Sequence, residues 1–209
     1  MGLAGTGPIY LEERDVAVSI DKERAIHKAA IQVISEYGFH KAKMAKIAEV
    51  AGVSAGSLYT YYSDKDHILD RIFEVLWKKD WAGLMPLAAR EDLGPQEKLE
   101  AAIDLIFDVL TGDRHLIIVF ANEFNNFMKN KEVSFSRHYT EFQRAFLSIL
   151  TEGQAEGVVN PHLPGAVICD FILGGIRKTL YERVTSDQEN DWAALRTHIK
   201  AMIRRGVMV

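Results

Sequence analysis

The chain has 209 residues, of which 48% are hydrophobic and 26% charged, proportions that indicate a globular protein and exclude a disordered or fibrous one. Its formal net charge of −4 excludes a polycation, so any nucleic-acid site has to be a local patch of the surface. Because no apolar run approaches the roughly 20 residues of a membrane helix and the N-terminus carries no secretion signal, we expect a cytoplasmic protein with no membrane partner.

Helical spacing of apolar residues dominates the chain after a short N-terminal arm. Residues 1–18 are expected to form that flexible arm. A first helix is expected from about Asp21 to Gly38, a residue that tolerates a left-handed backbone at a helix end. Shorter helices follow, the pattern breaks between Gly83 and Pro95, and longer helices are then expected over residues 95–110, 113–130, 132–156, 165–184 and 190–205.

A short stretch between two of the early helices has the mechanics of a helix-turn-helix. Ala48 is small enough for two helices to cross closely, and Gly52 tolerates the positive φ that a sharp turn requires. Ser54 can cap the second helix of the unit, because its hydroxyl can accept a bond from backbone N–H groups, and Leu58 is placed to bury the inner face of that helix. In such units the second helix enters the DNA major groove.

The same stretch resembles the signature of TetR-type transcriptional regulators. The matching runs are Ile47-Ala48, Ala51-Gly52-Val53-Ser54, Gly56-Ser57-Leu58-Tyr59-Thr60-Tyr61-Tyr62, Lys65 and Leu69. The match extends over residues 21–72. The resemblance implies a homodimer whose N-terminal modules bind a palindromic DNA operator. It also implies that the C-terminal helices enclose an inducer pocket and form the dimer interface.

Pattern and resemblance together predict an all-α protein. A helix-turn-helix DNA-binding domain is expected over residues 19–64, and a larger helical ligand-binding and dimerisation domain over residues 65–209. By position in the family's motif, the implied DNA-binding residues are Lys43, Lys46, Ser54, Ala55, Gly56, Ser57, Tyr59, Thr60, Tyr61 and Lys65. Tyr59 and Lys65 are the implied phosphate contacts, whereas Tyr62 is expected in the core.

The predicted body is rich in aromatic residues, which either form plain core or line a long apolar pocket. The predicted pocket residues are Phe107, Phe120, Phe124, Phe127, Phe142, Phe146 and Arg177. The runs 116–124, 149–158 and 171–176 are similar to TetR-type repressors of fatty-acid degradation, which respond to long-chain acyl-CoA. A multidrug-type or other hydrophobic ligand is the alternative effector.

A second surface is predicted from the run Gly165 to Ile176, which is apolar nearly all round and therefore buried on more than one side. Two adjacent glycines cost helix stability, roughly 1 kcal/mol each, which the close approach of another backbone would offset. The predicted dimer interface comprises Phe171, Gly174, Gly175, Leu195, Ile199 and Met202. A buried monomer core is the alternative for this run.

The sequence offers little chemistry for an enzyme. Its histidines are scattered, no set of ligands has catalytic or metal spacing, and Asp104 and Asp108 fit the solvated side of an apolar helix. Cys169, the single cysteine, excludes an intramolecular disulfide and fits a small buried hydrophobe. We therefore expect no enzyme activity, no metal and no cofactor other than a hydrophobic effector. A helical adaptor that lost DNA binding is the remaining alternative.

Overall fold

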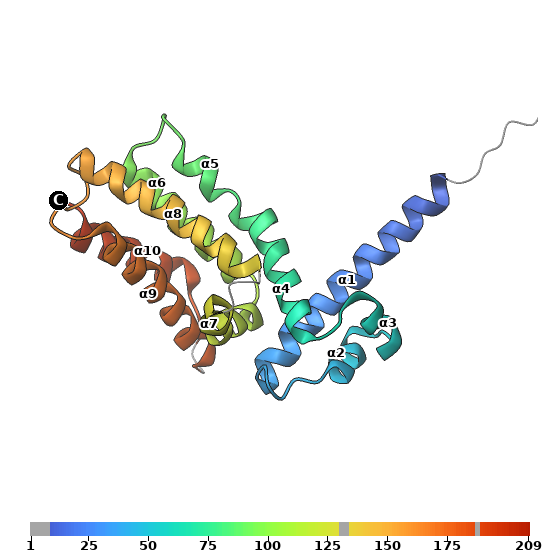
Figure 1. Ribbon diagram of the computed structural model, residues 1–209. Coiled ribbons are helices and arrows are strands. Elements are labelled where there is room, and N and C mark those ends of the chain that lie inside the picture. Colours follow the sequence, from blue (N-terminus) through green and yellow to red (C-terminus); the bar gives the residue numbers. More distant parts are fainter. Residues whose placement is uncertain (1–8, 130–133, 187–188) are drawn as a thin grey trace, which may run out of the picture. The chain divides into compact units, whose positions relative to one another are not determined.

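The computed structural model describes residues 9–129, 134–186 and 189–209 (Figure 1). These residues form helices and no named strand, which confirms the all-α prediction. The helices are α1 (Ile9–Tyr37), α2 (Met44–Ala51), α3 (Ala55–Tyr61), α4 (Lys65–Leu76), the π-helix η1 (Trp77–Trp81), α5 (Leu84–Ala88), α6 (Pro95–Leu110), α7 (Arg114–Lys129), α8 (Ser134–Ala155), α9 (Gly165–Thr185) and α10 (Trp192–Val207).

The chain divides into two compact units between Leu69 and Asp70, inside α4, whereas the sequence pattern placed the border at the start of this helix. The first helix also begins earlier than its apolar stripe indicates. Because α1 starts at Ile9, residues 9–18 of the predicted flexible arm are helical. The rest of that arm lies outside the described residues.

The first unit is built on α1, whose apolar stripe packs against α2. Ile26 and Ile34 of α1 are buried, and Ile47 of α2 and Leu58 of α3 are fully enclosed. Gly38 ends the regular part of α1 with a φ of 76°, and its N–H donates to the carbonyl oxygen of Ile34 at 2.9 Å. The apolar stripe of α1 is therefore the surface against which α2 packs, and α3 in turn packs against α2.

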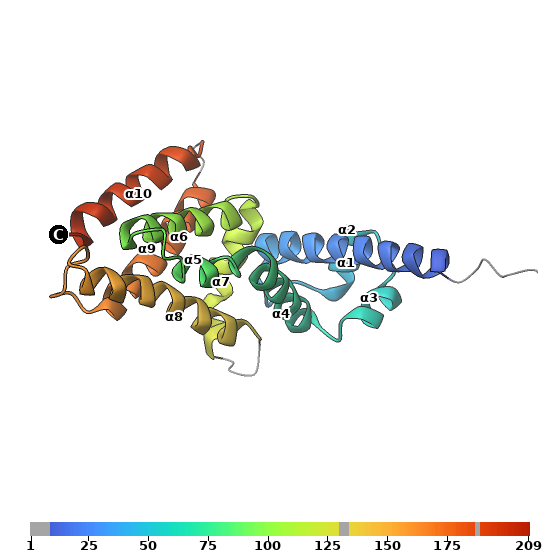
Figure 2. The same cartoon turned by 90° about the horizontal axis from the view of Figure 1, so that it is seen from above.

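In the second unit α8 packs against α5, α6, α7 and α9, and α10 packs against α6 and α9 (Figure 2). Aromatic side chains of α7 and α8 meet around Phe73 of α4. The centroid of its ring lies 5.2 Å from that of Phe127 and 5.0 Å from that of Phe135, and both pairs are edge-on. Aromatic pairs prefer this arrangement, because the positive ring edge faces the negative ring face.

A π-helix, η1, follows α4 directly, and the sequence pattern did not predict it. Its first and last residues, Trp77 and Trp81, are both buried, with ring centroids 4.3 Å apart. Neither indole N–H hydrogen-bonds to any residue in the described part of the chain. Single π turns are frequent at functional sites, so Trp77 and Trp81 are candidates for a functional role.

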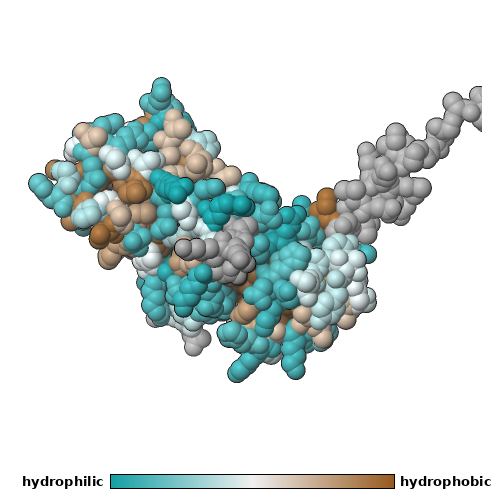
Figure 3. Space-filling model, in the orientation of Figure 1, coloured by the Kyte–Doolittle hydropathy of each residue, from teal (hydrophilic) through white to brown (hydrophobic). Residues whose placement is uncertain are grey.

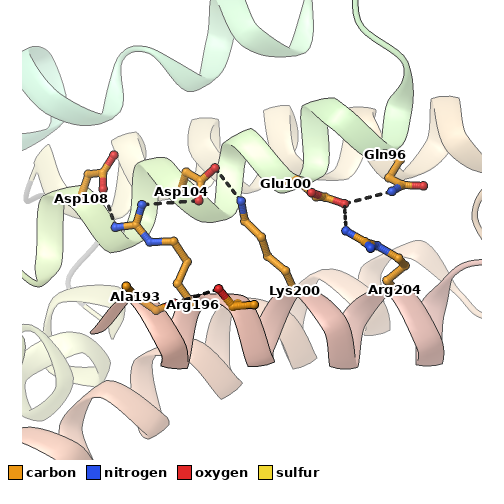
Figure 4. A network of polar contacts seen from close by, with 9 residues as sticks. Gln96, Glu100, Asp104, Asp108, Ala193, Arg196, Lys200 and Arg204 are labelled. Atoms are coloured by element: carbon orange, nitrogen blue, oxygen red, sulfur yellow. Dashed lines mark hydrogen bonds and ion pairs between the residues drawn. The ribbon is translucent and has the colours of Figure 1, made fainter. Parts of the chain in front are cut away.

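A charge ladder joins α6 to α10 (Figure 4). Arg204 donates to Glu100 at 2.7 Å, and Lys200 donates to Asp104 at 2.6 Å. Arg196 spans Asp104, at 3.5 Å, and Asp108, at 2.5 Å. The pairing order shows that the two helices run antiparallel. Asp104 and Asp108, which were expected only on a solvated helix face, therefore fix the position of α10.

Replacing Asp104 with asparagine is expected to destabilise the docking of α10, because Asp104 accepts bonds from both Arg196 and Lys200. Partly exposed ion pairs contribute at most about 1 kcal/mol each, which corresponds to a Tm lower by roughly 2–4 °C for a chain of this size. The loss should shrink in roughly 1 M salt, where charges are screened within about 3 Å. Asp92→Asn, at an exposed loop pair with Arg90, is the control and should leave Tm unchanged in differential scanning calorimetry.

Candidate DNA-binding face and effector cavity

The turn between α2 and α3 has the geometry that its residues predicted. Gly52 has a φ of 68° and its N–H donates to the carbonyl oxygen of Glu49, while the N–H of Val53 donates to that of Ala48 at 3.0 Å. The Ser54 hydroxyl accepts a bond from the N–H of Ser57 at 3.1 Å and caps α3. These local bonds set the direction in which α3 leaves the turn.

Helix α3 has one buried and one exposed face. Leu58 is completely enclosed, while Tyr59 is 57% exposed. The predicted DNA-binding residues on this helix lie mostly on the exposed face: Ser54, Ala55, Gly56, Tyr59 and Thr60 are exposed, whereas Ser57 and Tyr61 are half-buried. A Cβ atom added at Gly56 would meet no atom within 4 Å. The helix therefore presents a surface of small and hydroxyl-bearing residues that another molecule can approach closely.

The three tyrosines of this region have different environments. Tyr62 is 3% exposed, and its hydroxyl lies 2.7 Å from Nε2 of His27 and 3.4 Å from a carboxylate oxygen of Glu23, both on α1. Tyr62 therefore ties the end of α3 to α1, as expected for a core residue. Tyr59 points away from that core, and Tyr61 packs at a centroid distance of 6.4 Å from Tyr62.

The basic residues of the predicted DNA-binding set also differ. Lys43 is exposed, and Lys46 is half-buried and pairs with Glu49 at 2.7 Å. The ammonium group of Lys65 donates to the carbonyl oxygens of Phe39, His40 and Ala42 at 2.5, 3.2 and 3.4 Å, and it lies 4.4 Å from the Phe39 ring centroid. An ammonium group has three donors, so the loop between α1 and α2 occupies all of them. Lys65 thus holds this loop against α4 in the structure.

The second unit contains a partly enclosed, mostly apolar cavity of about 30 Å³. It is lined by Trp77, Trp81, Ile106, Leu110, Phe120, Tyr139, Phe142, Leu173 and Arg177. Of the predicted pocket residues, Phe120, Phe142 and Arg177 line this cavity. Phe107, Phe124, Phe127 and Phe146 are buried but do not line it. The sequence reading missed the two tryptophans, although their spacing continues the apolar stripe of α4 beyond Leu76.

Arg177 is the one charged residue in the lining of this cavity. Its guanidinium lies 3.7 Å from the ring centroid of Phe124, a cation–π contact. Within the described part of the chain it forms no ion pair and no hydrogen bond, and burial lowers its pKa because removal from water disfavours the charged form. A half-buried cation with no acidic partner at an apolar cavity is suited to a ligand that brings an oxygen acceptor.

The outer face of α9 is apolar and uncovered. Phe171 is 75% exposed and Met202 of α10 is 70% exposed, while Ile172 and Ile176 on the opposite side of α9 are buried. Added Cβ atoms at Gly174 and Gly175 would meet no atom within 4 Å. Leu195 and Ile199 are half-buried on α10. Figure 3 shows hydrophobic patches among hydrophilic ones on the second unit.

The described residues offer neither a metal cluster nor a membrane-spanning helix. No group of three or more His, Cys, Asp or Glu side chains is arranged to hold a metal ion there. Among the same residues no helix is both long and apolar enough to cross a membrane. Cys169 is buried, and burial raises the pKa of its thiol to about 12, so the thiol is neutral at ordinary pH.

Residues 26–72 match the family described as bacterial regulatory proteins, tetR family, and residues 92–181 match the tetracyclin repressor-like C-terminal domain. The fatty acid metabolism regulator protein of Bacillus subtilis (strain 168) is 30% identical over 190 residues, which are 89% of this chain and 95% of that protein. The chain belongs to the tetR family. It is a DNA-binding transcriptional regulator, since its relatives in this tetR family are regulators and not enzymes.

Solved structures agree with this tetR family membership. A transcriptional regulator FadR from Bacillus subtilis in complex with stearoyl-CoA is 29% identical, with a TM-score of 0.69 over 88% of this chain and 98% of that one. The fatty acid degradation regulator FadR from Bacillus halodurans is 26% identical, with a TM-score of 0.68 and the same two coverages. KstR2 of Mycobacterium tuberculosis, at 17% identity and a TM-score of 0.74 over 90% of this chain and 95% of that one, shares the fold.

Proposed function

We propose that this tetR family regulator is a cytoplasmic homodimer that represses genes of fatty-acid metabolism and leaves its palindromic operator when a long-chain acyl-CoA binds. The observation that carries the ligand assignment is the cavity of the second unit, which combines an apolar lining with one unpaired cation. The similar structure of FadR from Bacillus subtilis is a complex with stearoyl-CoA, a ligand with a long apolar chain and a carbonyl oxygen. Both parts match the chemistry of this cavity.

The size of the cavity supports a mechanism for release. About 30 Å³ is the share of liquid volume taken by one water molecule, whereas ligand pockets measure roughly 300–1,000 Å³. An acyl chain therefore fits only if the lining side chains move apart. We infer that the ligand stabilises a more expanded arrangement of these side chains. Such a shift requires the ligand to favour the expanded body by several kcal/mol.

The DNA-binding part of the proposal concerns the exposed face of α3. Its small residues allow close approach to the edges of bases, and the exposed Tyr59 and Lys43 are suited to phosphate contacts. Lys65 supports this face indirectly, because it fixes the loop before α2. In a dimer the two α3 helices read half-sites about one helical turn, or a multiple of it, apart.

The proposed function is tested in an electrophoretic mobility shift assay, which measures binding of the full-length protein to the DNA upstream of its own gene. Operator binding should weaken steeply with salt, and micromolar palmitoyl-CoA should release the DNA. Palmitate, coenzyme A and a hydrophobic dye are the matched comparisons. If a dye releases the DNA and palmitoyl-CoA does not, the regulator senses another hydrophobic ligand. If the protein shows no salt-sensitive binding to this DNA, the repressor part of the proposal is wrong.

Replacing Arg177 with methionine is expected to weaken palmitoyl-CoA binding by about tenfold or more, because a hydrogen bond from a charged donor contributes roughly 1.5–3 kcal/mol. Methionine keeps the apolar length of the side chain. Tm should stay constant or rise, since the variant lacks a half-buried cation without an acidic partner. Isothermal titration calorimetry measures the affinity, with the exposed Arg183→Met on the same helix as the control. Equal affinities of Arg177→Met and wild type would remove Arg177 from the ligand site.

A further inference from the structure

The wall of the effector cavity is shared with an open groove on the outside of the second unit. This groove has a volume of about 370 Å³ and is lined by Trp77, Lys78, Trp81, Ala82, Leu84, Met85, His138, Glu141 and Phe142. Trp77, Trp81 and Phe142 line both the cavity and the groove. These three side chains therefore lie between the cavity and the groove. If they move apart, the two volumes join.

The two tryptophans of this wall are suited to such a movement. Both stand on the π-helix η1, and neither indole N–H has a hydrogen-bond partner among the described residues. Rotation of either ring therefore breaks no hydrogen bond of the described protein. Leucine or phenylalanine would close the wall equally well without burying a polar group, so the unpaired N–H groups also offer donors to a ligand that passes between them.

A second groove continues the first along α8. Glu141 lines both, and the second groove, of about 330 Å³, is also lined by Met128, Ser136, Arg137, Thr140 and Arg144. Arg137 and Arg144 stand two helical turns apart, so they project from the same side of α8. Both are exposed, and the described residues provide neither of them with an ion-pair or hydrogen-bond partner.

The other charged side chains in the lining of these two grooves are Lys78 and Glu141. Glu141 lies 3.5 Å from Nδ1 of His138, and Lys78 pairs with Glu74 at 2.5 Å. Among the described residues, Glu141 is the one acidic side chain in the lining of the two grooves, so the two arginines outnumber it and the lining carries net positive charge. A planar guanidinium binds phosphate oxygens through two parallel N–H bonds, and two arginines at this spacing can hold two phosphates of one ligand.

We propose that Arg137 and Arg144 bind the phosphates of the effector's CoA headgroup, and that its acyl chain enters the cavity between Trp77, Trp81 and Phe142. This inference rests on the proposed function, because it assigns the phosphorylated end of the same ligand. The proposal also explains how the protein binds both the apolar and the charged parts of one ligand. The apolar cavity takes the hydrocarbon, Arg177 takes the carbonyl oxygen, and α8 carries the phosphates outside.

A third groove provides the contrast. It is lined by Gly83, Pro86, Leu87, Arg90, Ala101, Asp104, Leu105 and Asp108, and it shares no residue with the cavity. Its arginine is paired with Asp92, and its two aspartates are paired with Arg196 and Lys200 of α10. The groove along α8 differs, since Glu141 joins it to the groove at the cavity wall and its two arginines have no partner among the described residues.

The test compares palmitoyl-CoA with palmitate on the full-length protein by isothermal titration calorimetry at low and at physiological salt. The double variant Arg137→Gln/Arg144→Gln should lose tenfold or more in affinity for palmitoyl-CoA and less than twofold for palmitate. The wild-type preference for palmitoyl-CoA should also fall as salt rises. Arg183→Gln, which removes an exposed arginine from α9, is the matched control and should change neither affinity.

Three outcomes separate the two levels of inference. If wild type binds palmitoyl-CoA and the double variant binds it equally well, the headgroup assignment is wrong and the proposed effector stands. If both affinities fall together in the double variant, the arginines support the fold and do not recognise phosphate. If wild type binds no palmitoyl-CoA, the effector assignment itself is overturned. Circular dichroism and Tm of each variant identify a folding defect, and Arg144→Glu alone then provides a second measurement with the opposite charge.

Discussion

Replacing Gly56 with glutamate is expected to abolish operator binding while leaving the protein folded and slightly more stable. Gly56 lies on the exposed face of α3, where an added Cβ meets no atom within 4 Å, and its φ is not positive. Glutamate has a higher helix propensity than glycine by roughly 1 kcal/mol and suits the first turn of a helix. On DNA the same carboxylate would face phosphate and base edges, which costs several kcal/mol, or about 100-fold or more in affinity.

Fluorescence anisotropy of a labelled operator measures the affinity of this variant, and calorimetry measures its Tm. Gly112→Glu is the matched control, because it adds the same charge at an exposed turn of the second unit. It should leave operator binding unchanged. If Gly56→Glu binds the operator as wild type does, the face of α3 that carries Ser54, Gly56 and Tyr59 is not the DNA-binding surface.

The parts of the site that the sequence predicted are those governed by local bonds. Gly52 and Ser54 determine the turn and the cap of α3 through partners no more than four residues away, so their types and spacing were sufficient. Tyr62 was expected in the core from its place in the family's motif, and the structure buries it. In such cases residue types at a fixed spacing are enough to predict the local geometry.

The parts that the sequence did not predict depend on contacts between distant residues. Lys65 donates to carbonyl groups that lie 23 to 26 residues earlier, and no spacing rule identifies those partners. Asp104 and Asp108 face basic residues of α10 for the same reason. A charged residue beside an apolar stripe has the same pattern whether water or another helix lies next to it.

Helical periodicity also does not distinguish a packed ring from one that lines a cavity. Phe107 and Phe146 have the same spacing as Phe120 and Phe142, yet only the latter two line the cavity. Trp77 and Trp81 continue the apolar stripe of α4 at helical spacing, but that spacing does not show that a π-helix follows Leu76 or that both rings line a cavity.

Replacing Phe171 with glutamate is expected to give a folded monomer. Phe171 is 75% exposed in the single chain, so the charge disturbs nothing within it. Across the proposed dimer interface the carboxylate would be buried among apolar groups next to its own symmetry copy, and burial of an unpaired charge is strongly unfavourable. Light scattering after size exclusion should report half the mass of the wild-type dimer, and far-ultraviolet circular dichroism should be unchanged.

Loss of the dimer should also reduce affinity for the palindromic operator by about 100-fold or more, because the second half-site no longer binds within one complex. An isolated half-site should be bound equally by variant and wild type, which separates lost linkage from a damaged α3. Met85→Glu is the matched control, since Met85 is 54% exposed on α5 and lies outside the proposed interface. If Phe171→Glu remains a dimer, the apolar face of α9 is not the subunit contact. If wild type is a monomer and still binds the full palindrome tightly, the proposed dimer is wrong. The presence of Gly174 and Gly175 in α9 would then not be explained by the close approach of a partner helix.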